Sequence, residues 1–291
     1  MDRFEEVSGI DLDVRYASST ELAATLREEG DASPADVFFA VDPASLGAVA
    51  EAGLLARLPD DILSSVPERF SDRDGRWVGT SGRSRVVVYD PGRVHADDLP
   101  ETVAGFADPR WKGRLGIAPT NGSFLAFVAA MILTEGEDAT RAWLESIAVN
   151  EPLTYSSNSA IVAAVDTGEV DAGLANHYYL LIRRSQVDAS TARNHFMAGG
   201  DAGALVMPAG AGVLASSDRR DAAVDFVAFL LSPEAQRFFA EQSFEYPLVA
   251  GVDADPALPP LATLDPPDLD LGRLAAALDL ATELVADSGL V

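Results

Sequence analysis

The sequence predicts an α/β protein built of two lobes, and three observations support this prediction. Near the start of the chain, short apolar runs alternate with helical segments in a β-α-β-α order, which is typical of sheets with parallel strands. The length of 291 residues is sufficient for two lobes or one large domain. Two strand-like runs flank a glycine-serine break at residues 79–82, a pattern typical of a segment that crosses from one lobe to another.

The first elements each have a signal of their own. Residues 10–16 alternate apolar and polar side chains and therefore predict a strand. Ser18 or Ser19 caps the helix that follows, because a serine oxygen at this position accepts a hydrogen bond from a free helix N–H. Residues 35–40 predict a short apolar strand, and Asp42, with a proline after it, starts the next helix.

The rest of the chain continues to alternate strands and helices. Strands are predicted at residues 86–89, 114–118, 153–155, 170–174, 204–207 and 212–215. Helices are predicted at residues 44–52, 99–106, 123–133, 140–149, 159–167, 219–231, 232–242 and 271–286. The proline-rich residues 256–268 predict a linker. We assign residues 1–82 and 208–291 to lobe 1 and residues 83–207 to lobe 2, with the C-terminal helix able to pack back on lobe 2.

Composition excludes several classes of protein. A hydrophobic content of 48% with 23% charged residues is that of a folded globular chain, not a disordered one. The net charge of -25 argues against a nucleic-acid partner, which needs a basic surface. The chain has no cysteine, which excludes disulfides, thiolate metal sites and cysteine nucleophiles. No apolar run approaches the ~20 residues that a membrane-spanning helix needs.

Two adjacent tyrosines, Tyr178 and Tyr179, carry the main functional prediction. The strand before them ends at Asn176, a good N-cap for a helix that starts there. Neighbouring side chains diverge on a strand or a regular helix, so two adjacent phenols reach one point most easily at an irregular strand-to-helix junction. We interpret the pair as oxygen ligands for a hard trivalent cation, because such an ion deprotonates a phenol and phenolate suits ferric iron. The alternative is two ordinary aromatic residues, one in the core and one at its rim.

Three segments of the predicted second lobe share one design, in which a strand leads through a small polar loop into a helix. They are residues 118–123, 155–159 and 176–179. Ligands of open α/β sheets bind beyond the carboxyl ends of the strands. Helix N-termini with Asn and Ser side chains supply donors for anions. The three loops together therefore indicate an anion or oxyanion site, and ordinary helix capping is the alternative.

Other candidate residues carry weaker signals. His177 is a candidate metal ligand, although the two tyrosines that follow it compete for the same cavity. Arg83 and Arg85 lie on one face of a strand, where one of them can pair with an anion or form a salt bridge. The chain contains no nucleophile elbow, phosphate-binding loop or zinc-protease motif, so we predict no catalytic residues and no enzymatic activity.

At these residues the chain resembles the ferric-iron-binding solute receptors of ABC importers, which have the type II periplasmic binding protein fold. The most specific motif is Asn176-His177-Tyr178-Tyr179, because the family uses the adjacent tyrosines as iron ligands. The resemblance extends over nearly the whole chain and includes residues 35–39, 51–55, 79–89, 108–113, 158–159, 168–170 and 232–236. It implies a ligand cleft between two lobes, each with a mixed, mostly parallel sheet flanked by helices.

The resemblance also implies the remaining parts of the site. Tyr178 and Tyr179 match the metal-ligand pair, and the loops that hold a synergistic anion, such as carbonate or phosphate, match Asn121, Gly122, Ser123, Asn158 and Asn176. Members of the family often supply a histidine, sometimes a tyrosine, just after their first strand. That strand is not recognised in this sequence, so no residue is assigned as this ligand. Some members supply a glutamate at the position of Val41, so Asp42, or water and an anion, takes its role. Phe124 stands where some members have a third tyrosine.

The resemblance implies a monomer that carries ferric iron, closes by a hinge and delivers its cargo to an ABC permease at the membrane. We expect a periplasmic or extracellular location. Residues 2–7 indicate the end of a helix, so we expect an upstream strand and an export signal, or a lipid anchor, to precede the printed residues. The alternative function is a receptor for an organic anion such as a phosphonate, with the tyrosines as packing walls.

Overall fold

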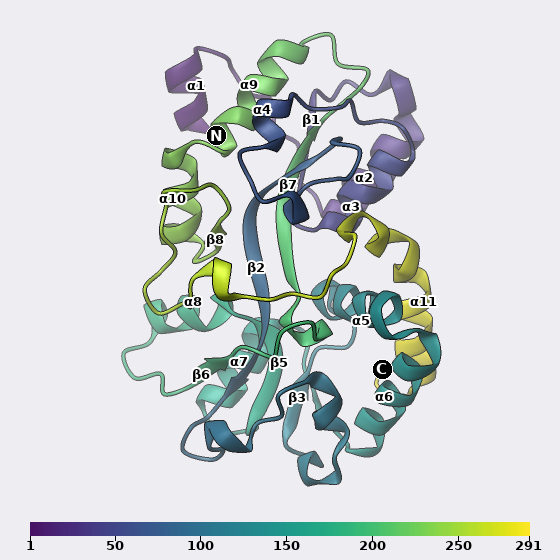
Figure 1. Cartoon of the computed structure of the whole chain (residues 1–291), viewed down its shortest axis with the longest axis vertical. Coiled ribbons are helices and arrows are strands. Elements are labelled where there is room, and N and C mark those ends of the chain that lie inside the picture. Colours follow the sequence, from purple (N-terminus) through teal and green to yellow (C-terminus); the bar gives the residue numbers. More distant parts are fainter. The chain divides into compact units, whose positions relative to one another are not determined.

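The computed structural model describes all 291 residues, and the chain forms two compact units. Unit 1 comprises Met1–Gly82, Met207–Pro256 and Asp270–Ala275. Unit 2 comprises Arg83–Val206, Ala257–Leu269 and Ala276–Val291. The strand β2 (Val78–Tyr89) continues from the first unit into the second without interruption, so the glycine-serine segment predicted as a break lies inside one strand (Figure 1).

Unit 1 contains a small sheet with helices packed on it. Its strands are β1 (Val37–Ala40), the first part of β2, most of β7 (Val206–Val213) and β8 (Tyr246–Pro247). Its helices are α1 (Asp2–Ser8), α2 (Ser19–Glu29), α3 (Pro43–Glu51), α4 (Asp60–Leu63), α9 (Arg220–Leu230) and α10 (Pro233–Gln242). The strand β7 needs glycine at Gly210, because a Cβ there would lie 2.7 Å from the carbonyl oxygen of Val78.

Unit 2 contains the second sheet and the remaining helices. Its strands are the second part of β2, β3 (Leu115–Ile117), β4 (Leu153–Thr154), β5 (Ala172–Asn176) and β6 (Arg193–His195). Its helices are α5 (Gly122–Glu135), α6 (Glu137–Val149), α7 (Asn158–Asp166), α8 (Tyr178–Gln186) and most of α11 (Leu274–Asp287). Figure 1 shows α7 and α8 on one side of this sheet and α5 and α6 on the other.

The predicted α/β class with mixed sheets is confirmed, but parallel strands are not the majority. The strand β3 is parallel to β4 and β5. Antiparallel pairs join β2 to β5, β6 and β8, and β1 to β7. The long strand β2 accounts for this difference, because it runs opposite to each of these three neighbours in the sheets.

Two predictions of strands differ from the structure. Residues 10–16 form no strand, since no neighbouring strand pairs with them and their side chains are exposed or half-buried. In this segment the N–H of Leu12 instead donates to the Glu5 carboxylate over 2.7 Å. The two short strands predicted at 204–207 and 212–215 are one strand, β7, whose glycines and proline interrupt the apolar pattern but not the ladder.

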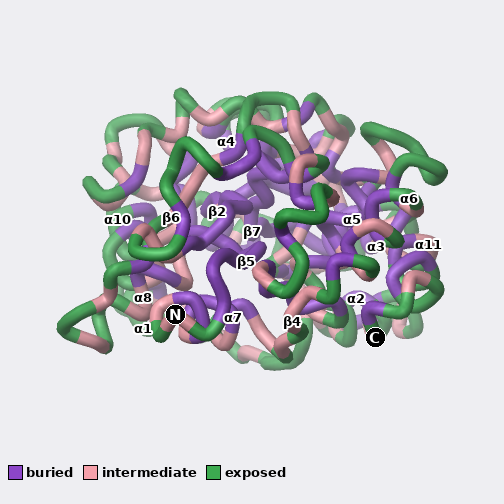
Figure 2. The backbone as a smooth tube through the Cα atoms, turned by 90° about the horizontal axis from the view of Figure 1, so that it is seen from below, coloured by how far each residue is buried: buried purple, intermediate pink, exposed green.

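The strands β2, β3 and β5 of the unit 2 sheet are almost entirely buried, whereas β4 and β6 are partly exposed. Every residue of β5 is buried, and Figure 2 colours β2, β5 and β7 as buried while exposed residues lie in the surrounding loops and helices. A core cluster of small and branched apolar residues joins β5 to α7 and includes Val88, Ile161, Val165, Ala175 and Leu180. Polar side chains therefore concentrate at the strand ends, where helices begin. No helix of the chain combines the length and apolar character that a membrane crossing requires.

Candidate functional site

The junction between β5 and α8 places the two tyrosines. The strand ends at Asn176, which is paired with Arg85 of β2 in the antiparallel ladder, and α8 begins at Tyr178. The prediction that Asn176 caps this helix was wrong: the N-cap is His177, and no side chain of the junction caps the helix. Asn176 cannot take that position because its backbone is still held in the strand ladder.

The rings of Tyr178 and Tyr179 lie against each other instead of diverging. Their centroids are 4.2 Å apart and their planes meet at 30°, which is a stacked arrangement. Both side chains are half-buried, and Tyr179 also packs on the core cluster of unit 2. The two stacked rings therefore lie side by side at the end of the strand, at the rim of the core. This geometry differs from the alternative in which one ring enters the core and the other points to solvent.

The backbone of β2 holds His177 in place. Its ring is fully buried, and its Nδ1 accepts a hydrogen bond of 3.0 Å from the N–H of Ser84. Its carbonyl oxygen accepts a hydrogen bond of 2.9 Å from the side chain of Asn194. The imidazole also contacts Tyr178 edge-on, with 5.8 Å between ring centroids. These contacts hold the residue that precedes the tyrosines in one orientation.

The other two predicted loops form one polar network. Asn121 caps α5 and accepts hydrogen bonds from the N–H of Ser123 at 3.0 Å and from its hydroxyl at 2.8 Å. The side chain of Asn158 donates to the hydroxyl of Ser123 at 2.9 Å and is almost fully buried. Ser157 caps α7 by accepting from the N–H of Ala160 at 3.2 Å. The N-termini of α5 and α7 are therefore linked to each other through side chains.

Arg85 of β2 joins this network to the tyrosines. It is 2% exposed, and one terminal nitrogen approaches the hydroxyl of Ser123 at 3.4 Å. Its guanidinium carbon lies 5.0 Å from the ring centroid of Phe127, and its other terminal nitrogen has no hydrogen-bond partner. Burial lowers the pKa of Arg85 to about 10, while the nearby Tyr179 acts in the opposite direction. Arg85 remains a cation at neutral pH, and no carboxylate pairs with it.

The predicted site residues separate into those that the structure brings together and those that it does not. Around Arg85 it gathers residues from all three predicted loops, namely Asn121, Ser123, Asn158, Asn176 and Tyr179. Gly122 is the first residue of α5. Arg83 lies in the same strand as Arg85, but its buried Nε has no partner. Asp42 belongs to unit 1, where its carboxylate caps α3 by accepting from the N–H of Ser45 at 2.7 Å.

One further polar atom of the site, on Asn176, has no partner within the protein. The side-chain oxygen of Asn176 is buried and has no hydrogen-bond partner. Neither unit contains a group of three or more His, Cys, Asp or Glu side chains that could hold a metal ion. Neutral amide and hydroxyl groups beside a buried cation favour an accompanying anion.

Comparison with known proteins gives a consistent result. The family model described as bacterial extracellular solute-binding protein matches residues 32–271. The chain is 38% identical over 296 residues to a protein named "Major ferric iron-binding protein" from Neisseria meningitidis serogroup B, and this match covers 99% of the chain and 88% of the relative.

Solved structures extend the comparison to the fold. Iron-bound HitA from Pseudomonas aeruginosa superposes on this chain with a TM-score of 0.90 at 38% identity. The match covers 99% of this chain and 94% of the HitA chain. A Trichodesmium protein in complex with iron and citrate superposes with a TM-score of 0.88 at 28% identity, with coverage of 99% and 94%.

Proposed function

We propose, on the premise that this chain belongs to the family of bacterial extracellular solute-binding proteins, that it is the receptor of an ABC importer for ferric iron. The fold is that of the type II periplasmic binding proteins, as the sequence predicts, and the family binds solutes for transport and does not catalyse reactions. The cargo is proposed from relatives named for ferric iron and from the chemistry of the residues in unit 2.

The stacked pair Tyr178 and Tyr179 is the observation that carries this proposal. The two rings lie 4.2 Å apart at the end of β5, and each ends in a phenol oxygen. Phenolate is a hard ligand that suits a trivalent cation, and the cation itself supplies the charge that removes the phenol protons. The buried cation Arg85 interacts electrostatically with Tyr179 and supplies a positive charge beside the pair.

An anion completes the proposed site. Asn121, Ser123, Asn158 and Asn176 supply neutral polar groups, and Arg85 supplies a positive charge without a carboxylate partner. A carbonate or phosphate held by these groups would bridge the protein to the metal and fill coordination positions that two phenolates leave open. The iron and citrate bound together in the Trichodesmium protein support an anion as a companion ligand. His177 contacts β2 and is proposed to position the tyrosines, and Asp42 caps α3, so this proposal uses neither as a ligand, and Arg83 stays an additional candidate for the anion.

The transport role implies a partner and a location. We propose that the loaded protein, as a monomer outside the cytoplasmic membrane, delivers iron to a membrane permease. The relatives named as periplasmic and uptake proteins support this assignment. The net charge of -25 is compatible with a carrier of a multivalent cation.

Iron loading of a tyrosine variant tests the proposal directly. Ferric iron and phosphate are added to the wild-type protein and to Tyr178→Phe with Tyr179→Phe, and bound iron is measured by elemental analysis after removal of excess metal. We expect about one iron per wild-type chain and a coloured solution, because phenolate-to-iron charge transfer absorbs visible light. The double variant should lose colour and bind iron at least about 100-fold more weakly, since changes in the surroundings of a metal alone cost 10- to 100-fold.

Tyr155→Phe is the matched control. Tyr155 packs on the same core cluster, and its hydroxyl donates to Glu169 at 3.0 Å, away from the other two phenols. Its loss should leave iron binding and colour unchanged. Equal iron binding by the double variant and the wild type would refute the assignment of the site. Stabilisation by phosphate or a phosphonate alone, with no response to iron, would instead indicate a receptor for an organic anion.

A further inference from the structure

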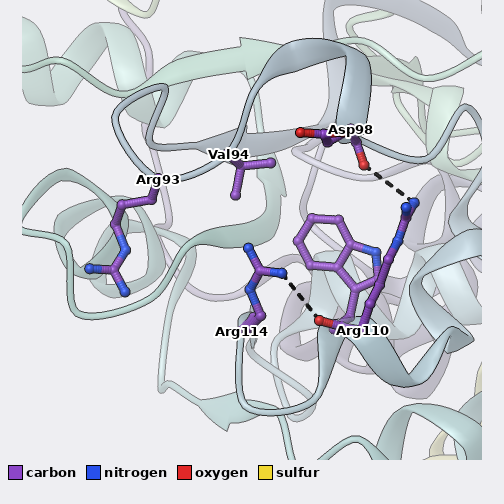
Figure 3. Close-up of a pocket in the computed structure, with 6 residues that line it drawn as sticks. Arg93, Val94, Asp98, Arg110 and Arg114 are labelled. Carbon is purple, nitrogen blue, oxygen red and sulfur yellow. Dashed lines mark hydrogen bonds between the residues drawn. The ribbon is translucent and has the colours of Figure 1, made fainter.

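A second group of cations lies in unit 2 and shares no residue with the tyrosine site. It surrounds a pocket of about 200 Å³ that is lined by Arg93, Val94, Asp98, Arg110, Trp111 and Arg114 (Figure 3). The whole chain has 21 lysines and arginines against 46 acidic residues. Three arginines around one small pocket are therefore a local concentration of positive charge in an acidic protein.

The carboxylate of Asp171 fixes two of these arginines. It is 7% exposed and accepts hydrogen bonds from the Nε atoms of both Arg93 and Arg114, the latter at 2.6 Å. Burial acts to raise the pKa of Asp171, but the hydrogen bonds from Arg114 and Arg93 outweigh it and lower the pKa, so the carboxylate stays ionised. Because Asp171 is bonded through Nε, the terminal nitrogens of Arg93 remain without a protein acceptor.

The indole of Trp111 lies beside the guanidinium groups of both Arg110 and Arg114. Trp111 is 2% exposed and is packed on Phe106, with 4.7 Å between the ring centroids. The guanidinium carbon of Arg114 lies 5.3 Å from the indole centroid and that of Arg110 lies 5.9 Å from it. Both cations therefore interact with one aromatic ring, which positions them but does not neutralise their charge.

Hydrogen bonds to backbone carbonyls leave further donors unused. Arg110 donates from one terminal nitrogen to the carbonyl of Asp98 at 3.3 Å, and Arg114 donates to the carbonyl of Arg110 at 3.2 Å. The indole N–H of Trp111 is buried and has no acceptor. In the view of Figure 3 the guanidinium group of Arg114 lies between those of Arg93 and Arg110. Three cations thus face a pocket whose only lining carboxylate is that of Asp98.

We propose that this pocket binds a small oxyanion, such as inorganic phosphate or the carboxylate of a small organic acid. The planar fork of an arginine matches two oxygens of such a group, and several forks around one pocket can hold it from different sides. An anion would also relieve the repulsion between cations that share one indole. The volume accommodates an ion of this size and excludes a large ligand. The proposal is independent of the iron site.

The indole N–H signals in a ¹H–¹⁵N NMR spectrum of the iron-free protein test this site. The chain has three tryptophans, so the spectrum has three such signals, and Trp111→Phe identifies the one from the pocket. We expect phosphate and acetate, added separately at constant ionic strength, to shift the Trp111 signal saturably, while the signals of Trp77 and Trp143 stay in place. The response to each anion shows which oxyanion the pocket prefers.

Matched charge variants separate a specific site from general screening. Arg110→Gln removes one guanidinium that makes a single hydrogen bond at 3.3 Å, so the fold should be retained, and we expect about ten-fold weaker binding. Arg141→Gln removes the same charge from an ion pair with Glu137 elsewhere in unit 2 and should bind as the wild type does.

Asn158→Ala, which alters the network beside the tyrosines, should leave the Trp111 response unchanged. If Trp111→Phe does not fold, calorimetric titration of the two arginine variants with phosphate gives the same comparison. The absence of a saturable shift at tens of millimolar phosphate and acetate would overturn the proposal. Equal weakening in Arg110→Gln and Arg141→Gln would overturn it as well, because it would show nonspecific attraction.

Discussion

Three helices of unit 2, α5, α7 and α8, differ in whether a side chain accepts a hydrogen bond from their first free N–H groups. At α5 and α7 a local side chain caps the helix, Asn121 in one case and Ser157 in the other. At α8 no side chain caps the helix, and the N-cap residue His177 is instead anchored to the backbone of Ser84. Beside it, the side-chain oxygen of Asn176 is buried without a partner. Two of these junctions are complete in themselves, whereas the third leaves polar groups unmatched.

This difference separates stability from ligand binding. A capped helix start contributes to folding and needs no ligand. An uncapped start retains the partial positive charge of the helix dipole, and it attracts anions and ionised ligands. The stacked phenols stand at the uncapped start, next to a buried arginine. The comparison therefore predicts that substitutions of the capping side chains lower stability, while substitutions of the phenols and of the unmatched Asn176 lower affinity.

Among the substitutions that test this comparison, Arg85→Met should give the largest effect on binding. Arg85 links Ser123 at a capped junction to Tyr179 at the uncapped one, and it is the buried cation proposed to face the anion. We expect the affinity for ferric iron with phosphate to fall about 10- to 100-fold, measured by competition with a coloured chelator. The free energy of unfolding without iron should not fall, because one terminal nitrogen of this buried cation has no hydrogen-bond partner within the protein.

Arg83→Met is the control for this substitution, since it removes the same charge from the same strand without a contact to Ser123. Its iron affinity should stay close to that of the wild type. If Arg83→Met weakens iron binding as much as Arg85→Met does, the charge of the strand matters and the position of Arg85 does not.

His177→Leu should have a smaller effect, which falls on the free energy of unfolding and not on the affinity for iron. It removes the acceptor of the buried Ser84 N–H, and an unsatisfied buried donor costs about 1–3 kcal/mol. Urea unfolding without iron measures this loss. His95→Leu, in an exposed loop, should change stability by less than about 0.5 kcal/mol. A loss of iron affinity in His177→Leu as large as in the tyrosine variant would make His177 a ligand and contradict the positioning role.

Local patterns in the sequence were sufficient to predict part of this arrangement. Asn121 and Asp42 cap the helices that they precede, because capping depends on a few neighbouring residues. The α8 junction could not be predicted in the same way. The pairing of Asn176 with Arg85 and the bond between His177 and Ser84 join residues about 90 positions apart, and they move the cap from Asn176 to His177. Long-range strand register therefore overrode a local preference.

The arginine pocket shows the same limit more clearly. Asp171 meets Arg93 and Arg114 across 78 and 57 residues of sequence, so no spacing in the chain indicates the cluster. At residues 10–16 the sequence instead indicates an element, a strand, that the structure does not contain. Its alternation of apolar and polar residues was present, but a strand also needs a neighbour to pair with, and none lies beside it.

Two asparagine substitutions provide the smallest and most direct test of the contrast between junctions. Asn121→Ala removes a cap with bonds to the N–H and hydroxyl of Ser123 and should destabilise the iron-free protein by about 1 kcal/mol. Asn176→Ala removes a side-chain oxygen that has no partner and should leave the stability unchanged. With iron and phosphate present, the affinity of Asn176→Ala for iron should fall, because the variant lacks the side-chain amide whose N–H groups are proposed to donate to the anion. Equal losses of stability in urea unfolding would show that the α8 junction is as complete as the α5 junction.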